Sequence, residues 1–277
     1  MEIVEKYIQG KYDNPKLCED GICESENYIA VIDGVSSQSD FKYEGKKLGK
    51  IICDILLEAI PKMSVDLDCF QAIKFLNEYI IKFYKEHVIY DKICNDAADQ
   101  PAASVIIYSK SKNQIWLIGD CTALCGEMII KNNLAVDELY TNIRKMVIEY
   151  FLATGYSEKQ LLENDIGYKF VQNLSKRQPY IRNKKFNSIY DYAVIDGFNM
   201  PDVSLVKCID VPENIEELVF ASDGYREPKK TLDESEKFIK HMRETDPLCY
   251  KEYLNFKSFT KGLVHYDDRA YIRFKIK

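Results

Sequence analysis

Apolar segments of strand length recur along this chain, and several of them end or begin at an aspartate. Segments that are apolar at consecutive positions are typical of strands buried on both faces. They cover residues 28–32, 115–118, 218–222 and 270–274, and the adjoining aspartates are Asp33, Asp120, Asp223 and Asp267. The pattern therefore predicts buried strands whose ends carry carboxylates at the rim of a sheet.

Apolar residues at helical spacing lie between these segments, and Ser157 and Thr231 each begin a capping-box motif. Helices are predicted over residues 45–60, 68–88, 134–152, 157–174 and 231–243. Strands are predicted over residues 1–9, 27–33, 102–108, 114–118, 122–130, 203–209, 218–221 and 268–276. Because the three strands within 102–130 follow one another closely, we expect them to form an antiparallel meander.

The order of these elements predicts the fold class. Strands and helices do not alternate regularly, as they would in a parallel α/β fold. We therefore expect an α+β fold, a four-layer α-β-β-α sandwich in which two mainly antiparallel sheets are flanked by helices. Without linker composition or long repeats, residues 1–277 are predicted to form a single domain. Residues 134–199, helical and then polar and basic, are predicted to form an insert or flap beside the site.

Composition and charge narrow the class of partner. Hydrophobic residues make up 46% of the chain, charged residues 30%, and the net charge is -6. Nucleic-acid binding requires a clustered positive face, which the sequence lacks. No apolar stretch has the length of a membrane span, and nine irregularly spaced cysteines indicate reduced thiols. We therefore expect a cytoplasmic monomer that binds neither nucleic acid nor a membrane.

The acidic strand ends carry the candidate chemistry. A hairpin between Glu19-Asp20 and Asp33-Gly34 would bring acidic groups together at one rim. Carboxylates gathered in this way repel each other unless a hard divalent cation lies among them. Asp33 can bridge two cations, and two ions about 4 Å apart can deprotonate a water and hold a phosphoryl oxygen. The residues therefore indicate a Mg²⁺ or Mn²⁺ site that hydrolyses phosphate esters.

Taken in order, the acidic motifs resemble those of a known enzyme family. The motifs are Glu19-Asp20, Asp33-Gly34, Gly119-Asp120, Ser222-Asp223-Gly224 and Asp267-Asp268. They resemble the metal-dependent type 2C serine/threonine protein phosphatases, and the resemblance covers residues 1–277. It implies a signalling hydrolase that uses a metal-activated water to attack the phosphoserine or phosphothreonine ester of a phosphorylated protein.

The resemblance also implies a binuclear centre of two Mn²⁺ or Mg²⁺ ions. Asp33 would bridge the ions, and the Gly34 carbonyl would bind one of them. Asp223 and Asp267 would bind the other ion. These three aspartates would act in catalysis through the metal-activated water.

Further positions complete the implied site. Glu19 or Asp20 would hold metal-bound water in the outer shell, and Asp120 matches the aspartate that supports a third ion in bacterial members. An aspartate after glycine between two strands is equally typical of a hairpin turn, so Asp120 is either a ligand of a third ion or a turn residue. The family's phosphate-binding arginine has no counterpart before Arg144, which leaves Lys16 as the candidate. A lysine, however, cannot form the two parallel hydrogen bonds that an arginine makes with a phosphate. Arginines from elsewhere in the chain are the alternatives, namely Arg177, Arg182 and Arg226.

A repeated motif shows why the order of these motifs matters more than any one of them. Residues 193–197 repeat residues 30–34 letter for letter. An aspartate followed by glycine is by itself a common turn. Because Asp196 lies outside the ordered set, we predict that it is a structural turn residue, whereas Asp33 belongs to the site.

The functional prediction is a Mn/Mg-dependent phosphatase that hydrolyses phosphoserine and phosphothreonine esters. Two alternatives stay open. One is a catalytically weak or inactive binding protein with the phosphatase fold, and the other is a metal-dependent phosphatase of a small phosphorylated metabolite. A plain structural domain, in which every aspartate is a turn residue, is a more remote third.

Overall fold

The computed structural model describes residues 1–36 and 39–276 and contains two five-stranded sheets in which every pairing is antiparallel. The first sheet has the order β1 (Glu2–Gln9), β10 (Arg269–Lys275), β9 (Glu217–Ala221), β6 (Thr122–Cys125) and β7 (Met128–Lys131). The second has the order β2 (Asp20–Glu24), β3 (Tyr28–Gly34), β4 (Ala103–Ser109), β5 (Gln114–Ile118) and β8 (Lys207–Asp210).

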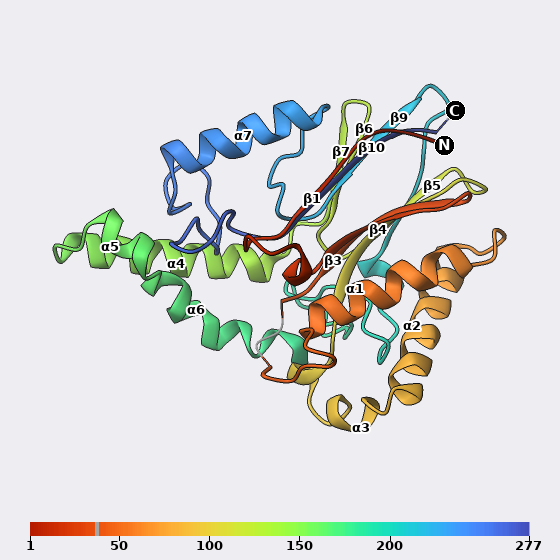
Figure 1. Ribbon diagram of the computed structural model, residues 1–277, viewed down its shortest axis with the longest axis horizontal. Coiled ribbons are helices and arrows are strands. Elements are labelled where there is room, and N and C mark those ends of the chain that lie inside the picture. Colours follow the sequence, from red (N-terminus) through yellow and green to blue (C-terminus); the bar gives the residue numbers. More distant parts are fainter. Residues whose placement is uncertain (37–38, 277) are drawn as a thin grey trace.

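Helices cover the outer face of each sheet, which confirms the predicted α-β-β-α sandwich (Figure 1). α1 (Leu48–Ala59), α2 (Cys69–Glu86) and the short α3 (Tyr90–Ile93) lie on the side of the second sheet. α7 (Leu232–Thr245) lies on the side of the first sheet. α4 (Ala135–Ala153), α5 (Glu158–Glu163) and α6 (Ile166–Ser175) lie beyond the end of the sheets that is opposite the chain termini. Single 3₁₀ turns lie at Pro15–Leu17, Ile60–Lys62, Ala97–Asp99, Gln178–Tyr180 and Val203–Leu205.

Alternating side chains of β3 explain why its sequence is continuously apolar. Ile29 and Val31 belong to the core between the two sheets, where they join Phe220 and Ile272. The intervening residues of β3 belong instead to the core beneath α1 and α2. A strand buried on both faces needs apolar side chains at every position, as predicted from the sequence.

The predicted meander is wrong in its third strand. β4 and β5 pair as expected, but the chain then crosses to the other sheet, where β6 pairs with β9. The crossing occurs at Gly119, whose φ is 91° and where a Cβ would lie 2.1 Å from Ser104 Oγ. Residues 122–130, predicted as one strand, form the hairpin β6–β7 with a turn at Gly126 (φ 63°). Positive φ values are accessible to glycine without steric cost, so each turn depends on its glycine.

Two other predicted elements are shorter than expected. The helix predicted over 157–174 is divided into α5 and α6, because Asp165 accepts the Tyr168 N–H (2.8 Å) and begins a new helix. The strand predicted over 203–209 begins with a 3₁₀ turn, and only Lys207–Asp210 pairs as β8. The remaining predicted helices and strands lie where expected to within a few residues.

A buried ion pair connects the helices beyond the sheets to the loop before β10. Arg144 on α4 is fully buried, and its Nη2 lies 2.6 Å from Asp165 Oδ2. The same guanidinium donates to the Asn255 carbonyl at 2.9 Å, and Ser258 Oγ donates to Asp165 at 2.6 Å. Because these groups satisfy one another away from water, they hold α4, α6 and residues 255–258 in one arrangement.

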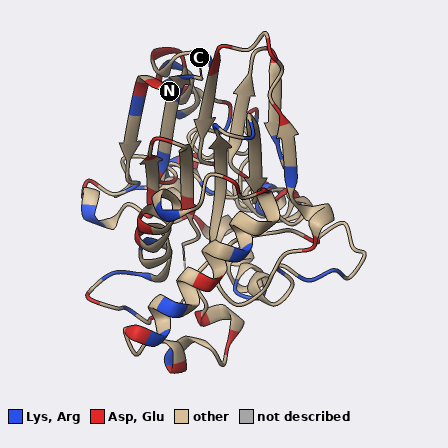
Figure 2. Ribbon diagram, turned by 90° about the vertical axis from the view of Figure 1, so that its right-hand side faces the viewer, with Lys and Arg blue, Asp and Glu red and all other residues tan. Residues whose placement is uncertain are grey.

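Charged side chains follow the layered architecture. Figure 2 shows basic and acidic positions interspersed along helices and loops, while the strands carry charge mainly near their ends. No helix among the described residues combines the length and the apolarity that a membrane crossing requires.

Candidate active site

The hairpin of β2 and β3 brings two predicted acidic residues face to face. Asp20, the first residue of β2, is the direct antiparallel partner of Asp33 near the end of β3. Directly paired residues on neighbouring strands project on the same side of a sheet with Cβ atoms about 5 Å apart. Asp33 Oδ2 also accepts the backbone N–H of Asp223 at 3.3 Å, which joins the ends of the two sheets.

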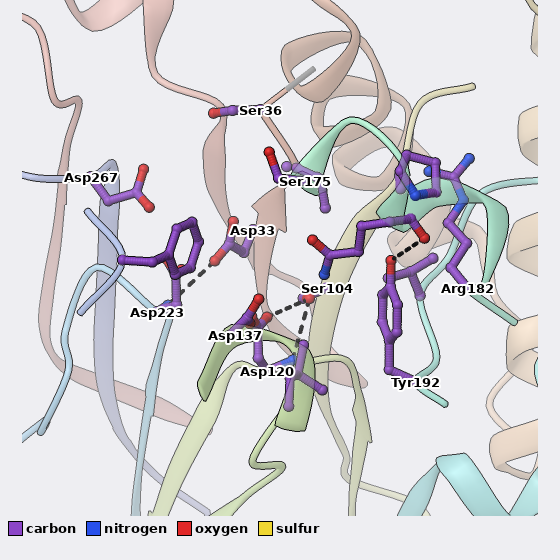
Figure 3. Close-up of a pocket in the computed structure, with 18 of the residues that line it drawn as sticks. Asp33, Ser36, Ser104, Asp120, Asp137, Ser175, Arg182, Tyr192, Asp223 and Asp267 are labelled. Carbon is purple, nitrogen blue, oxygen red and sulfur yellow. Dashed lines mark hydrogen bonds between the residues drawn. The ribbon is translucent and has the colours of Figure 1, made fainter. Parts of the chain in front are cut away.

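The other predicted aspartates line the same cavity. Asp120 follows β5, where Ser104 Oγ donates to its Oδ1 at 2.6 Å. The cavity is lined by seven aspartates, namely Asp20, Asp33, Asp120, Asp137, Asp223, Asp267 and Asp268, but by only three basic residues, Lys176, Arg182 and Lys257. Figure 3 shows the carboxylates of Asp33, Asp137 and Asp267 turned toward one shared space. The site therefore carries an excess of negative charge.

Burial and mutual repulsion disfavour ionisation in this cluster. Burial raises the pKa of Asp33, and the charges of Asp223, Asp20 and Asp120 raise it further. Burial, and then the charge of Asp268, raises the pKa of Asp20 well above its usual range. Asp20 Oδ2 also lacks a hydrogen-bond partner within the described part of the chain. An uncompensated carboxylate cluster of this kind is stabilised by bound cations.

Two lysines supply part of the missing positive charge. Lys11 Nζ lies 3.2 Å from Asp267 Oδ1, 3.4 Å from Asp268 and 3.5 Å from Glu19. Lys257 Nζ contacts Asp267 and lies 3.6 Å from Asp223. Burial lowers the pKa of both ammonium groups, but the attraction of neighbouring carboxylates outweighs it and keeps both pKa values raised. Both lysines therefore stay protonated at neutral pH.

The donor set fits a hard divalent cation, although it is not arranged as a finished coordination shell. No group of three ligating side chains within residues 1–36 and 39–276 converges on a single point. All available donors are oxygens, as Mg²⁺ and Mn²⁺ prefer. Glu19 Oε1 is buried without a partner among the described residues, and it lies with the Gly34 carbonyl beside Gly49. A Cβ on Gly49 would lie 2.6 Å from Glu19 Oε1 and 2.9 Å from Gly34 O, so a side chain would fill this cradle.

The carboxylate of Asp268 holds the backbone of two other segments of the site. Its Oδ1 accepts the Lys11 N–H at 2.7 Å, and its Oδ2 accepts the Glu19 N–H at 3.1 Å. The start of β10 thus fixes the backbone on which Lys11 and Glu19 are carried.

Three functional candidates were missed from the sequence. Asp137 lies in the first turn of α4, where an acidic residue is common simply because it favours the helix dipole. Lys11 and Lys257 lie in loops, and no local motif distinguishes them from the other lysines. Only the folded chain shows that Asp137 and Lys257 line the cavity and that Lys11 contacts the carboxylates of Asp267 and Asp268.

Asp137 makes the metal-free protein sensitive to pH. Burial, and then the charge of Asp120, raises the pKa of Asp137 to about 7. The folded chain therefore keeps a proton that the unfolded chain loses near pH 4, so stability should fall as pH rises from about 4 to 7. We expect Asp137→Asn to reduce the fall in the free energy of unfolding between these pH values by about 1–2 kcal/mol. The value is modest because the side chain is partly exposed and solvent screens its charge. Urea unfolding in EDTA at pH 4.5 and pH 8 measures it, and an equal effect of the variant at both pH values would contradict the prediction.

Lys16 and Asp196 lie outside the acidic cavity. Lys16 is exposed on the 3₁₀ turn Pro15–Leu17 and lines a neighbouring groove. Asp196 is fully buried, lies 3.3 Å from Arg182 Nε, and accepts the backbone N–H groups of Phe198 and Asn199. Asp196 is therefore a structural turn residue, as predicted. The same ion pair holds the guanidinium of Arg182, one of the arginines considered for phosphate binding, against Asp196.

Comparison with known proteins gives likenesses of structure alone. No family model matches the sequence, and no curated protein matches it. The serine/threonine phosphatase PstP/Ppp of Mycobacterium tuberculosis is 10% identical, with 99% of this chain and 98% of that chain covered and a TM-score of 0.48. The serine/threonine phosphatase Stp1 of Staphylococcus aureus is 11% identical, with 100% and 96% covered and a TM-score of 0.48. The PstP catalytic domain in complex with two manganese ions is 9% identical, with 100% of both chains covered and a TM-score of 0.45.

Proposed function

We propose that this chain is a Mn²⁺- or Mg²⁺-dependent phosphatase that hydrolyses phosphoserine and phosphothreonine esters of a phosphorylated protein. The observation that carries the proposal is the convergence of Asp20, Asp33, Asp120, Asp223 and Asp267 on one cavity from the ends of separate strands. Carboxylates that disfavour one another's ionisation are found where function requires them, because folding alone would not select them. The ordered motifs that resemble type 2C phosphatases are the same residues.

The proposed ligands are the residues predicted for a binuclear centre. Asp33 and the Gly34 carbonyl are assigned to one ion, with Asp33 shared, and Asp223 and Asp267 to the other. Asp120, held by Ser104, is assigned to a third ion. Such ions supply Lewis-acid activation of water.

The remaining polar groups of the site would orient water and phosphate. Glu19 and Asp20 carry buried oxygens without partners among the described residues, so they can accept hydrogen bonds from a water molecule. Lys11 and Lys257 can donate to phosphate oxygens, because each lysine offers up to three N–H groups. These lysines would supply the positive charge for which a family arginine is missing, and Lys16 would act further out.

Residues 134–199 are proposed to act as the flap that sets substrate choice. Asp137, Tyr168 and Gln178 from this segment line the acidic cavity. We further propose that the chain acts as a single unit over 1–277 and functions as a cytoplasmic monomer.

One observation favours the alternative of a weak or inactive binding protein. Lys257 contacts Asp267, one of the proposed metal ligands, and no group of three ligating side chains in the described part of the chain is preassembled. In an active enzyme, metal binding would have to displace this lysine toward the phosphate.

The decisive experiment is a Mn²⁺ titration of phosphate release from a phosphothreonine peptide. We expect activity that rises with Mn²⁺, disappears with EDTA, and is accompanied by Mn²⁺ binding in calorimetry. Mn²⁺ binding without turnover of a phosphopeptide or of p-nitrophenyl phosphate would favour the inactive alternative. Turnover of phosphorylated metabolites but not of phosphopeptides would favour the metabolite phosphatase.

A further inference from the structure

A lysine-rich groove opens beside the acidic cavity. It has a volume of about 820 Å³ and is lined by nine lysines but only four acidic residues. Ser36, Tyr168, Lys257 and Asp267 line both the groove and the acidic cavity, so the two are continuous. A phosphate bound near Lys257 would therefore have its neighbouring groups at the mouth of the groove.

Several of these lysines are not neutralised by the protein. Lys46 and Lys50 share Asp54, at 2.8 and 2.9 Å. No carboxylate within the described ranges forms an ion pair with Lys42 or Lys47, and Lys169 bonds only to the neutral side-chain amide of Asn164. All three side chains are exposed. Unpaired charges of one sign in a concave surface attract ligands of the opposite sign.

The start of α1 adds to the positive character of the groove. Lys47 is the N-cap residue of α1, its side chain makes no capping hydrogen bond, and the first turn contains no acidic residue. No acidic residue of the first turn therefore offsets the partial positive charge of the helix N-terminus, although the Glu19 carboxylate from outside the helix lies beside Gly49.

We propose that this groove binds the acidic or additionally phosphorylated segment that flanks the phosphorylated residue of a protein substrate. The proposal rests on the proposed function, because it places the phosphorylated residue itself at the acidic cavity. The lysines come from separate parts of the chain, namely the loop after β1, the 3₁₀ turn Pro15–Leu17, the loop before α1, α1 itself, α6 and the loop before β10. Charges distributed along a groove fit an extended acidic segment, whereas a small polyphosphate would need them to converge on one point. Protein substrates with acidic flanks would thus be selected over those with neutral flanks.

The test measures binding as well as activity. Fluorescence anisotropy would give the affinity of two labelled phosphothreonine peptides, one with glutamate flanks and one with glutamine flanks. The variant Lys42→Gln/Lys47→Gln/Lys169→Gln removes three groove charges, and Lys74→Gln/Lys82→Gln/Lys240→Gln removes three exposed lysine charges outside the groove. We expect wild-type protein to prefer the glutamate peptide about tenfold at low salt, and high salt to erase the preference. The groove variant should lose the preference, while the control variant should keep it.

The outcomes separate this proposal from the proposed function. Turnover of p-nitrophenyl phosphate should be unchanged in the groove variant, because the three lysines lie outside the acidic cavity. Equal binding of both peptides by wild-type protein, or a preference that survives in the groove variant, would overturn the groove proposal even in an active enzyme. Displacement of either peptide by tripolyphosphate, without any preference between them, would instead indicate a small polyanion and would also overturn it. Selective binding without phosphatase activity would support the groove and refute the proposed function.

Discussion

Replacing Asp33 with asparagine is expected to abolish phosphatase activity and to leave the fold intact. Asp33 lies opposite Asp20 and accepts the Asp223 N–H at 3.3 Å, so it connects the ends of the two sheets at the site. Losing its charge removes the proposed bridging ligand. We expect activity to fall by at least about 100-fold, since changes in outer-shell groups alone cost roughly 10–100-fold. Phosphate release and Mn²⁺ calorimetry measure the effect.

Asp210→Asn is the matched control for this prediction. Asp210 ends β8 in the same sheet and is exposed, outside the acidic cavity. This variant should keep full activity and Mn²⁺ affinity. Because burial and neighbouring charges raise the pKa of Asp33, the asparagine should not destabilise the metal-free protein at pH 8. Unchanged activity of Asp33→Asn would refute its assignment as a ligand.

Replacing Arg144 with methionine is expected to cause the largest loss of stability. The guanidinium is fully buried, and its removal would leave Asp165 buried without a charge partner. Breaking a buried ion pair from one side typically costs about 3–5 kcal/mol. The Asn255 carbonyl would also lose its donor. Urea unfolding at neutral pH would measure the loss.

Arg273→Met provides the comparison for a pair near the surface. Arg273 pairs with Glu5 and Glu217, and its side chain is 23% exposed. Such pairs contribute about 1 kcal/mol or less. If Arg144→Met cost no more than Arg273→Met, the Arg144–Asp165 pair would not be the connection that holds residues 255–258 in place. Lys257 would then need another explanation for its position in the site.

The fold was predictable where local patterns and tertiary packing agree. The continuous apolar run of β3 predicted burial on both faces, and the capping motifs at Ser157 and Thr231 begin helices as predicted. The crossing after β5 was not predictable, because a glycine followed by aspartate fits a hairpin turn as well as a change of sheet. The choice depends on which strand lies free to pair, and β9 is about a hundred residues further along the chain.

The residues of the candidate site that lie at strand ends were predictable, whereas those on helices and loops were not. Strand-end aspartates are visible because an apolar run makes their position unusual, and the structure brings Asp20, Asp33, Asp120, Asp223 and Asp267 to one cavity. Asp137 and Lys257 lie on a helix and a loop, where charged residues are ordinary. Their placement depends on the packing of α4 and residues 255–258, which no local pattern encodes.

The antiparallel pairing of β2 with β3 makes the site dependent on the length of one short connection. Successive residues of a strand project to opposite faces, so the connection over residues 25–27 determines which pairs of side chains share a face. Because β4 holds β3 in register, a slip of β2 by one residue would set Gly21 against Asp33 and turn the Asp20 carboxylate to the opposite face of the sheet. The protein can therefore tolerate changes of composition in this connection far better than a change in its number of residues.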